Sequence, residues 1–316
     1  MNEKIKIYAI VGPTASGKSA LALEMARRFD GEIVSCDSMQ IYKRMNIGTA
    51  KPTAEEMAVV PHHMIDVAEP SESFSCAEYV EMADSIIRDI NKRGKKPIIC
   101  GGTGLYLDSL LRGSDFKEGI TDEKLRESLM EFARENGAHA LHRELERIDP
   151  DSAATIHPNN VKRVARAIEI YRLGGVTKTE LDRDSRKPEN RFDIRCVGLF
   201  YSNRDTLYKR IEARVDMMLE AGLERETREL LADGVFEKNA TAAQAIGYKE
   251  LLAYVRGEEA LSEAVDRLKT ATRRYAKRQI TWFGAKGYVH RIDVDNGADK
   301  KTFEEIVNIT DKHFFY

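Results

Sequence analysis

One stretch near the amino terminus has the residue types and spacing of a loop that holds phosphate. It consists of Gly12, Pro13, Thr14, Ala15, Ser16, Gly17, Lys18 and Ser19. This stretch fits the pattern G-x-x-x-x-G-K-[ST] at every position, and it lies between an expected strand and an expected helix. Backbone N–H groups and a helix N-terminus attract anions, Lys18 adds a full charge, and the Ser19 hydroxyl can ligate Mg²⁺. The motif predicts a site for a nucleoside triphosphate or for another diphosphate.

An acidic residue follows the second apolar segment, where a strand is expected to end. Asp37 comes directly after the sequence EIVSC, and Ser38, Met39 and Gln40 follow it. Ligands of open α/β sheets bind at the carboxyl ends of the strands, so Asp37 should lie beside the phosphate loop. The carboxylate could be a general base, a Mg²⁺ ligand or only an N-cap, and its position leaves all three open.

A glycine-rich turn follows the apolar segment KPIIC at residues 96–100. Its sequence is Gly101, Gly102, Thr103 and Gly104. Glycines at a strand end let the backbone approach a ligand closely, and Thr103 would direct its hydroxyl toward the phosphate loop. The alternative is an ordinary glycine-rich turn without a ligand.

The elements that hold these residues are predicted by short apolar runs that alternate with helical patterns. Strands are expected at residues 6–11, 32–36, 62–67 and 96–100, with helices at 19–29 and 75–92. This alternation favours an α/β fold, a parallel sheet with helices on both faces.

The pattern changes after residue 122 and is helical up to residue 181. The charged, turn-rich residues 182–191 predict a loop, and strand patterns return at 193–201 and 288–294. The simplest architecture is a catalytic core of residues 1–117 and 190–316, interrupted by a helical insertion domain at 118–189.

Composition excludes several classes of protein. The 316 residues carry a net charge of −2, with 42% hydrophobic and 32% charged residues, so the whole chain is not a polycation. No apolar run approaches the roughly 18–20 residues that a membrane span needs. The amino terminus lacks the apolar core of a signal peptide. The four cysteines are scattered singly, which argues against a zinc knuckle and favours reduced thiols of a cytoplasmic protein.

Two basic stretches could bind nucleic acid. Residues 160–172 predict a basic helix, which could equally be an ordinary solvated face. Residues 267–291 contain no acidic residue, and this asymmetry favours contact with a phosphate backbone. Trp282 and Tyr288 lie within this run, and Trp282 is better explained as part of the core.

Seven sequence blocks occur in an order that resembles one enzyme family. They are GPTASGKS, DSMQIYKRMNIGTAKP, PHHMIDV, GGTGLY, IHPNNVKRVARAIEIY, QAIGYKE and AKRQITWF, and the resemblance runs from about residue 7 to residue 283. Together they resemble the tRNA dimethylallyltransferases, also called tRNA isopentenyltransferases. The chain resembles the compact bacterial form, because it has no C-terminal zinc finger.

The resemblance implies a P-loop NTPase-like fold and a prenyl transfer. The donor would be dimethylallyl diphosphate, and the acceptor would be N6 of the adenosine immediately 3′ of the anticodon in tRNA. Asp37 would be the general base, and Thr103 would help to position the diphosphate. Residues 12–19 would hold that diphosphate with Mg²⁺, and Arg214 would contact the donor.

The resemblance also implies where tRNA binds. The insertion would grip the anticodon stem-loop, and the target adenosine would be flipped into a channel through the core. The implied tRNA-binding residues are Asp37, Ser38, Met39, Gln40, Arg126, Val161, Lys162, Arg163, Val164, Ala165, Gln244, Gly247, Tyr248 and Lys249. The chain is expected to act as a monomer.

Three other functions compete with this one. A small-molecule or nucleoside kinase would explain the phosphate loop and Asp37, but not the basic run or the insertion. A non-catalytic tRNA- or nucleotide-binding module should have lost Lys18, Asp37 or Thr103, and all three are present. A prenyltransferase that uses a free nucleotide as acceptor would not need a long basic surface.

Overall fold

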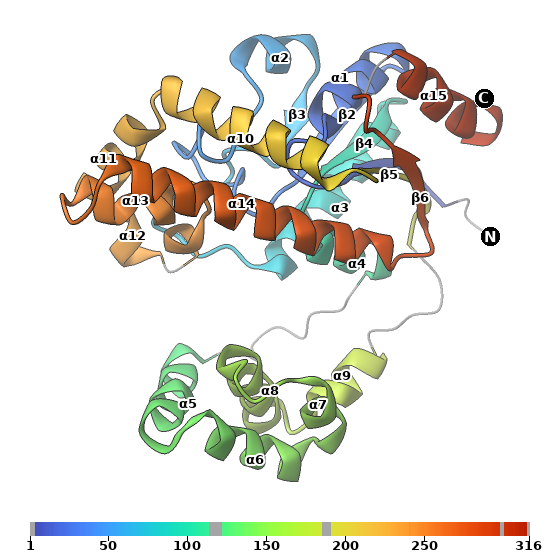
Figure 1. Cartoon of the computed structure of the whole chain (residues 1–316). Coiled ribbons are helices and arrows are strands. Elements are labelled where there is room, and N and C mark those ends of the chain that lie inside the picture. Colours follow the sequence, from blue (N-terminus) through green and yellow to red (C-terminus); the bar gives the residue numbers. More distant parts are fainter. Residues whose placement is uncertain (1–3, 114–121, 185–190, 240, 298–299, 315–316) are drawn as a thin grey trace. The chain divides into compact units, whose positions relative to one another are not determined.

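The chain forms two compact units, which are described separately here. The computed structural model describes residues 4–113, 122–184, 191–239, 241–297 and 300–314. The core unit consists of Met1–Leu111 and Arg191–Tyr316, and the helical unit of Arg112–Asn190 (Figure 1). The second unit is thus an insertion between two halves of the first.

The core unit is built on a six-stranded sheet with the order β3-β2-β4-β1-β5-β6, in which every neighbouring pair is parallel. Its strands are β1 (Lys6–Val11), β2 (Gly31–Cys36), β3 (His62–His63), β4 (Lys96–Gly101), β5 (Asp193–Phe200) and β6 (Val289–Asp293). The prediction of a parallel α/β sheet is therefore confirmed. Because all strands run the same way, the residues after β1, β2 and β4 meet at one edge.

Helices cover both faces of this sheet. Tyr8 and Ile10 of β1 pack with residues of α1, α10 and α15, whereas Ile7 and Ala9 pack with α3 and α4. The helical elements of the core unit are α1 (Lys18–Arg28), α2 (Ala54–Val59), α3 (Cys76–Lys92), α4 (Gly104–Arg112), α10 (Arg204–Glu220), α11 (Leu223–Ala232), α12 (Val235–Lys238), the 3₁₀ helix η1 (Ala242–Gln244), α13 (Tyr248–Val255), α14 (Leu261–Gly284) and α15 (Lys300–Phe314). This two-sided packing follows from the period of two along a strand, which sends alternate side chains to opposite faces.

A third apolar cluster lies beside the sheet. It joins Ile41, Tyr42 and Met45, from the segment after β2, to α10, α11, α13 and α14. The segment after β2 is therefore packed against helices that come some 200 residues later in the chain.

The strand expected at residues 62–67 is mostly absent. Only His62 and His63 pair with β2. Met64 and Asp66 have φ angles of 61° and 56°, which turn the backbone out of the extended region. Met64 is fully buried, so the apolar pattern that suggested a strand is that of a turn folded onto the core.

The helical unit has its own apolar core. Its helices are α5 (Glu123–Asn136), α6 (Ala138–Ile148), α7 (Pro150–Thr155), α8 (Val161–Gly174) and α9 (Lys178–Asp184). Leu129, Leu141, Leu145, Val164 and Ile168 belong to a core that α5, α6, α7 and α8 share. Most of the loop expected at 182–191 lies outside the described residues.

Candidate active site

The phosphate loop has the shape that its sequence predicts. Gly12 and Gly17 have φ angles of 148° and 90°, and a Cβ at Gly12 would lie 2.8 Å from the Leu199 carbonyl oxygen. The first turn of α1 has no side-chain cap and no acidic residue, so its N–H groups are available to an anion. The buried Ser16 hydroxyl finds no partner among the described residues. These features suit a phosphate group.

A cavity of about 270 Å³ opens beside this loop. Its phosphate-loop wall is made by Thr14, Lys18 and Ser19, and its other charged residues are Asp37, Arg214 and Arg278, together with His62. Apolar side chains form a further part of the wall: Ala22, Ile33, Met39, Ile65, Val215, Met218, Ile246 and Leu268. The cavity thus combines an anion-binding end with an apolar surface large enough for a small hydrocarbon group.

Two cations of the cavity, Lys18 and Arg214, interact electrostatically with the same carboxylate, that of Asp37. Burial lowers the pKa of Lys18, and Arg214 lowers it further, while Cys100 and Asp37 oppose this shift. Burial likewise lowers the pKa of Arg214, and Asp37 again opposes the shift. An anionic ligand would supply the negative charge that these cations lack, so the electrostatics favour binding of a diphosphate.

Asp37 follows β2 and lines the cavity. Its Oδ1 accepts hydrogen bonds from the backbone N–H groups of Met39 at 2.9 Å and Gln40 at 3.4 Å. The capping interpretation is therefore right as a description of the local turn. It does not compete with a chemical role, since the same contacts hold the carboxylate in the cavity wall.

Thr103 faces Asp37's turn and not the phosphate loop. The Ser38 N–H donates to its hydroxyl oxygen at 3.0 Å, and the Thr103 N–H donates to the Cys36 carbonyl at 3.0 Å. The expectation that this hydroxyl points toward the phosphate loop is wrong, because the parallel pairing of β2 and β4 brings Ser38 closer. Thr103 holds the turn that carries Asp37.

The glycines after β4 are explained by a helix far along the chain. A Cβ at Gly102 would lie 2.0 Å from Gln279 Nε2, and one at Gly104 would lie 2.2 Å from the Trp282 ring. Gln279 Oε1 accepts from the Thr14 N–H at 2.8 Å, and its Nε2 donates to the Gly102 carbonyl at 3.1 Å. Sequence reasoning missed Gln279, whose only signal was its place in the block AKRQITWF.

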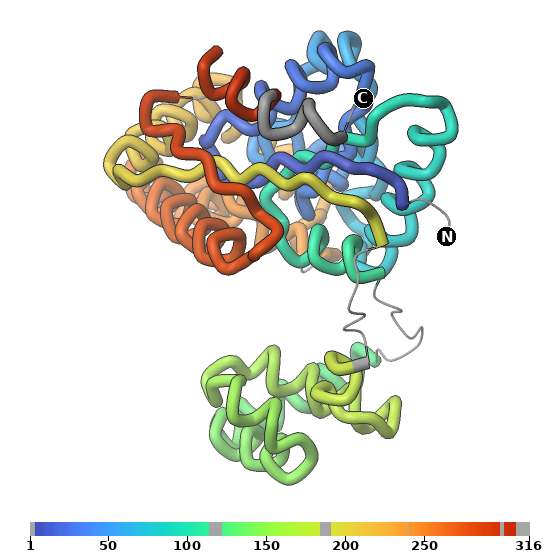
Figure 2. Tube along the Cα trace, turned by 90° about the vertical axis from the view of Figure 1, so that its right-hand side faces the viewer, coloured from blue at the N-terminus to red at the C-terminus, as the bar shows by residue number. Residues whose placement is uncertain are grey.

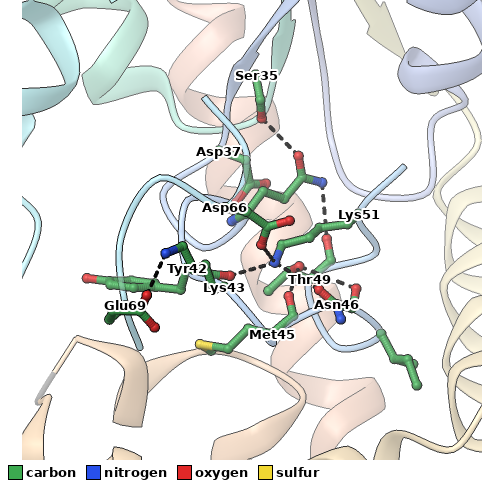
Figure 3. A network of polar contacts seen from close by, with 12 residues as sticks. Ser35, Asp37, Tyr42, Lys43, Met45, Asn46, Thr49, Lys51, Asp66 and Glu69 are labelled. Atoms are coloured by element: carbon green, nitrogen blue, oxygen red, sulfur yellow. Dashed lines mark hydrogen bonds and ion pairs between the residues drawn. The ribbon is translucent and has the colours of Figure 1, made fainter. Parts of the chain in front are cut away.

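Residues 37–40, 48–50 and 52 line one wall of the cavity, and a polar network holds the segment at residues 37–52 (Figure 3). The Lys51 side chain is 4% exposed, and its Nζ donates to the Tyr42 carbonyl at 2.5 Å, to Asn46 Oδ1 at 2.9 Å and to Asp66 Oδ1 at 2.5 Å. Gln40 Nε2 donates to the carbonyl of Ala50 at 3.1 Å. Lys51 therefore has a structural role, because its hydrogen bonds fix the conformation of this segment.

A buried carboxylate holds the same wall from the other side. Glu226 of α11 accepts hydrogen bonds from the N–H groups of Asn46 at 3.1 Å, Ile47 at 2.9 Å and Gly48 at 3.2 Å. The Tyr248 hydroxyl donates to Glu226 Oε1 at 2.6 Å. A Cβ at Gly48 would lie 2.5 Å from the Tyr248 ring, which explains the glycine in the block containing NIGTAKP.

The residues expected to bind tRNA in the core unit fall into two groups. Ser38, Met39, Gln40, Gln244 and Gly247 line the cavity. Tyr248 is fully buried beneath Gly48, so its side chain is not a surface contact. Lys249 donates to Gln244 Oε1 at 2.8 Å, which places that cation at the cavity rim.

The residues expected to bind tRNA in the helical unit are also divided. Lys162 and Arg163 are exposed on α8, and Val161 is half-buried. Val164 and Ala165 are fully buried in the core of this unit, so their side chains do not reach solvent. Arg126 donates to the buried carboxylate of Glu169 at 3.0 Å, and Arg166 donates to it at 2.8 Å. This carboxylate fixes both guanidinium groups at the surface.

The acid-free run at residues 267–291 is less available to phosphate than expected. Four of its cations form ion pairs with acidic residues from outside the run: Arg267 with Glu259, Lys269 with Asp216, Arg273 with Glu212, and Lys286 with Asp108. The excess of positive charge here is therefore smaller than the sequence suggests, and contact with a phosphate backbone stays a prediction. Arg274 and Lys277 remain exposed on α14, and Arg278 lines the cavity.

The donor set suits Mg²⁺ only as an ion shared with a ligand. Among the described residues, no group of three or more histidine, cysteine or acidic side chains could hold a metal. The Ser19 hydroxyl and the Asp37 carboxylate both line the cavity, and both are oxygen donors. Since Mg²⁺ in proteins commonly takes one or two protein oxygens together with substrate phosphates and water, these residues fit it.

Comparisons with known proteins agree with this geometry. Residues 40–286 match the family model described as IPP transferase. A tRNA dimethylallyltransferase of Caldanaerobacter subterraneus is 48% identical over 303 residues, or 96% of this chain and 95% of the relative. One from Bacillus cytotoxicus is 48% identical over 302 residues, which are 96% of this chain and 94% of the relative.

Solved structures give the same result. A tRNA isopentenylpyrophosphate transferase from Bacillus halodurans is 44% identical with a TM-score of 0.71, and the match covers 97% of this chain and 95% of that one. A eukaryotic dimethylallyltransferase acting on tRNA is 31% identical with a TM-score of 0.79, and the match covers 96% of this chain and 78% of that one. No helix in the described ranges is long and apolar enough to cross a membrane. The chain has a P-loop NTPase-like core and belongs to the IPP transferase family.

Proposed function

We propose that this chain is a tRNA dimethylallyltransferase. It transfers the dimethylallyl group of dimethylallyl diphosphate to N6 of the adenosine immediately 3′ of the anticodon in tRNA, and it releases diphosphate. The observation that carries the proposal is a single cavity with a phosphate loop at one end, Asp37 beside it and an apolar wall. A kinase needs the first two features, whereas a prenyl donor also needs the third.

The reaction breaks the allylic C1–O bond of the donor and forms a bond between C1 and N6. The adenine amino group is a weak nucleophile because its lone pair is delocalised into the ring. Asp37 accepts the N6 proton, a role worth roughly 10²- to 10⁴-fold in rate. Thr103 acts on this step through the Ser38 N–H, which it holds at 3.0 Å.

The leaving diphosphate gathers negative charge as the C1–O bond breaks. The N-terminus of α1, Lys18 and Arg214 stabilise that charge from fixed positions. Mg²⁺, held by the diphosphate with the Ser19 hydroxyl, would neutralise part of the same charge. The apolar side chains Val215, Met218 and Leu268 receive the hydrocarbon group and keep water from the allylic carbon.

The helical unit supplies the second part of the proposal, which is a grip on the anticodon stem-loop. Its exposed cations, Lys162 and Arg163, are suited to phosphate contacts that position the RNA without reading its sequence, and the half-exposed Arg126 is oriented by its ion pair with Glu169. The adenosine must leave the base stack to present N6 to Asp37. The expected location is the cytoplasm, and the chain is expected to act as a monomer.

The test is a transfer assay with labelled dimethylallyl diphosphate, Mg²⁺ and bulk unmodified tRNA, followed by nucleoside analysis. The expected product is N6-(dimethylallyl)adenosine in the RNA. Parallel reactions replace tRNA with AMP or ATP as acceptor, or replace the donor with labelled ATP. Label on the free nucleotide alone, or phosphate transfer from ATP, would refute the proposal.

A further inference from the structure

Gln279 on α14 joins two loops of the site that are far apart in sequence. Its side chain is buried, with 4% exposure. Oε1 accepts from the Thr14 N–H of the phosphate loop at 2.8 Å, and Nε2 donates to the Gly102 carbonyl at 3.1 Å. An N–H needs an acceptor and a carbonyl needs a donor, so only one orientation of the amide satisfies both loops.

Further contacts connect Gly102 to Asp37, the proposed general base. Gly102 precedes Thr103, whose hydroxyl accepts from the Ser38 N–H at 3.0 Å. Ser38 belongs to the turn that Asp37 closes through the Met39 N–H at 2.9 Å. A connected path therefore runs from the diphosphate end of the cavity to the base, and Gln279 is its central member.

The Gln279 amide packs closely against Gly102. A Cβ at Gly102 would lie 2.0 Å from Nε2, while its next neighbours are Gln279 Cδ at 3.2 Å and the Gly12 carbonyl oxygen at 3.7 Å. At Gly102 it is therefore Gln279 that limits how near α14 comes to the turn after β4, as Trp282 does at Gly104.

We propose that Gln279 is a positioning residue that sets the separation between the phosphate loop and Asp37. The inference rests on the proposed function. In a transfer between two bound substrates, the donor carbon and N6 must lie at attack distance, and a misplacement of about 1 Å can cost about 10²-fold in rate. A change at Gln279 should therefore slow the chemical step with both substrates bound, besides weakening donor binding.

The principal test compares Gln279→Met, which keeps the length and removes both hydrogen bonds, with Thr281→Ala on the same helix. Thr281 is exposed and donates only to the Lys277 carbonyl of its own helix. The measurements are the single-turnover rate at saturating dimethylallyl diphosphate and tRNA, the affinity for inorganic diphosphate with Mg²⁺ by calorimetry, and the affinity for tRNA.

Gln279→Met should lose at least about tenfold in single-turnover rate and several-fold in diphosphate affinity, with tRNA affinity within about twofold of wild type. Thr281→Ala should match wild type in all three. A Gln279→Met rate and diphosphate affinity within about twofold of wild type would overturn the inference. A rate loss equal to the loss of folded enzyme, with normal diphosphate affinity in the folded fraction, would overturn it too.

A double-variant cycle tests the same geometry from the other loop. Gly102→Ala should slow transfer in the wild-type background because its methyl group displaces Gln279. It should have little further effect in Gln279→Ala, where the displaced side chain is gone. Additive losses would overturn the inference. If wild-type enzyme transfers nothing to tRNA, the proposed function fails, while the diphosphate affinities still decide whether Gln279 shapes the phosphate loop.

Discussion

Removing the carboxylate of Glu226 should destabilise the core unit strongly, although Glu226 is not among the residues that line the cavity. Glu226 is 9% exposed, and its carboxylate accepts from three backbone N–H groups and from the Tyr248 hydroxyl. Burial, and then the neighbouring Glu226, raise the pKa of Tyr248, so that hydroxyl stays protonated and is the donor. Four donors would lose a charged acceptor at once.

The magnitude follows from these contacts. A buried donor left without a partner costs about 1–3 kcal/mol, and water can reach part of the segment at residues 46–48. Glu226→Ala should therefore cost about 3–5 kcal/mol, and Glu226→Gln, which keeps one acceptor oxygen, about half as much. Tyr248→Phe should cost about 1–2 kcal/mol, because it removes one donor and keeps the ring packed beneath Gly48.

The assay is urea unfolding of each variant at pH 7, with Glu229→Gln as the matched control on α11. Glu229 is exposed, and its ion pair with Arg225 is long, at 3.9 Å. Its replacement should therefore change the unfolding free energy by less than about 0.5 kcal/mol. A cost for Glu226→Gln no larger than that of Glu229→Gln would refute the reasoning. It would show that solvent replaces the carboxylate without loss.

Four further predictions concern the site, the RNA surface and pH. Lys18→Ala should nearly abolish prenyl transfer at saturating tRNA, and transfer near the wild-type rate would contradict the assignment of the diphosphate to this loop. Asp37→Asn should slow the single-turnover rate by about 10²- to 10⁴-fold with a smaller change in tRNA affinity, whereas an unchanged rate would leave Asp37 only a turn cap. Arg274→Glu, at an exposed position of α14, should weaken tRNA binding and lower its salt dependence by about one to two ions; an unaltered salt slope would exclude an RNA contact there. Hydrogen bonds from Arg93 lower the pKa of Glu32 to about 2. A lowered pKa stabilises the fold above the unfolded value, so roughly 2–3 kcal/mol should be lost between about pH 4.5 and pH 2. The stability difference between wild type and Glu32→Gln should shrink over that range, and a difference independent of pH would refute this.

The strands, the phosphate loop and the position of Asp37 could be predicted from the sequence because each depends on neighbouring residues. Continuous apolar runs and the glycine–lysine spacing are local signals, and β1 and β4 begin where the apolar pattern begins. The turn at Met64 escaped prediction because its positive φ is imposed by tertiary packing, and Met64 carries no local signal for it.

The errors at the site have the same origin. The hydrogen bond between Gln279 and Thr14 joins residues 265 positions apart. The hydrogen bond between Tyr248 and Glu226 likewise depends on tertiary structure, which no local sequence pattern predicts. The basic run at 267–291 has no acidic residue of its own, but Glu212, Asp216 and Asp108 reach it from α10 and α4. Charge counted along a sequence therefore overstates the charge that a surface offers.

The central place of β1 in the sheet has a consequence for how the protein is made. β1 lies between β4 and β5 in the sheet, and Figure 2 shows the blue trace of β1 beside the yellow trace of β5. The partner residues in β5 begin at Asp193, which leaves the ribosome long after β1. Until then one edge of β1 is open, and contacts of such long sequence separation form slowly. The helical unit, whose core needs only residues 125–168, can fold first. The helical unit is therefore synthesised completely before β5 and β6 can join the sheet. Until β5 pairs with β1, the open edge of β1 leaves the nascent chain most prone to wrong association with other chains.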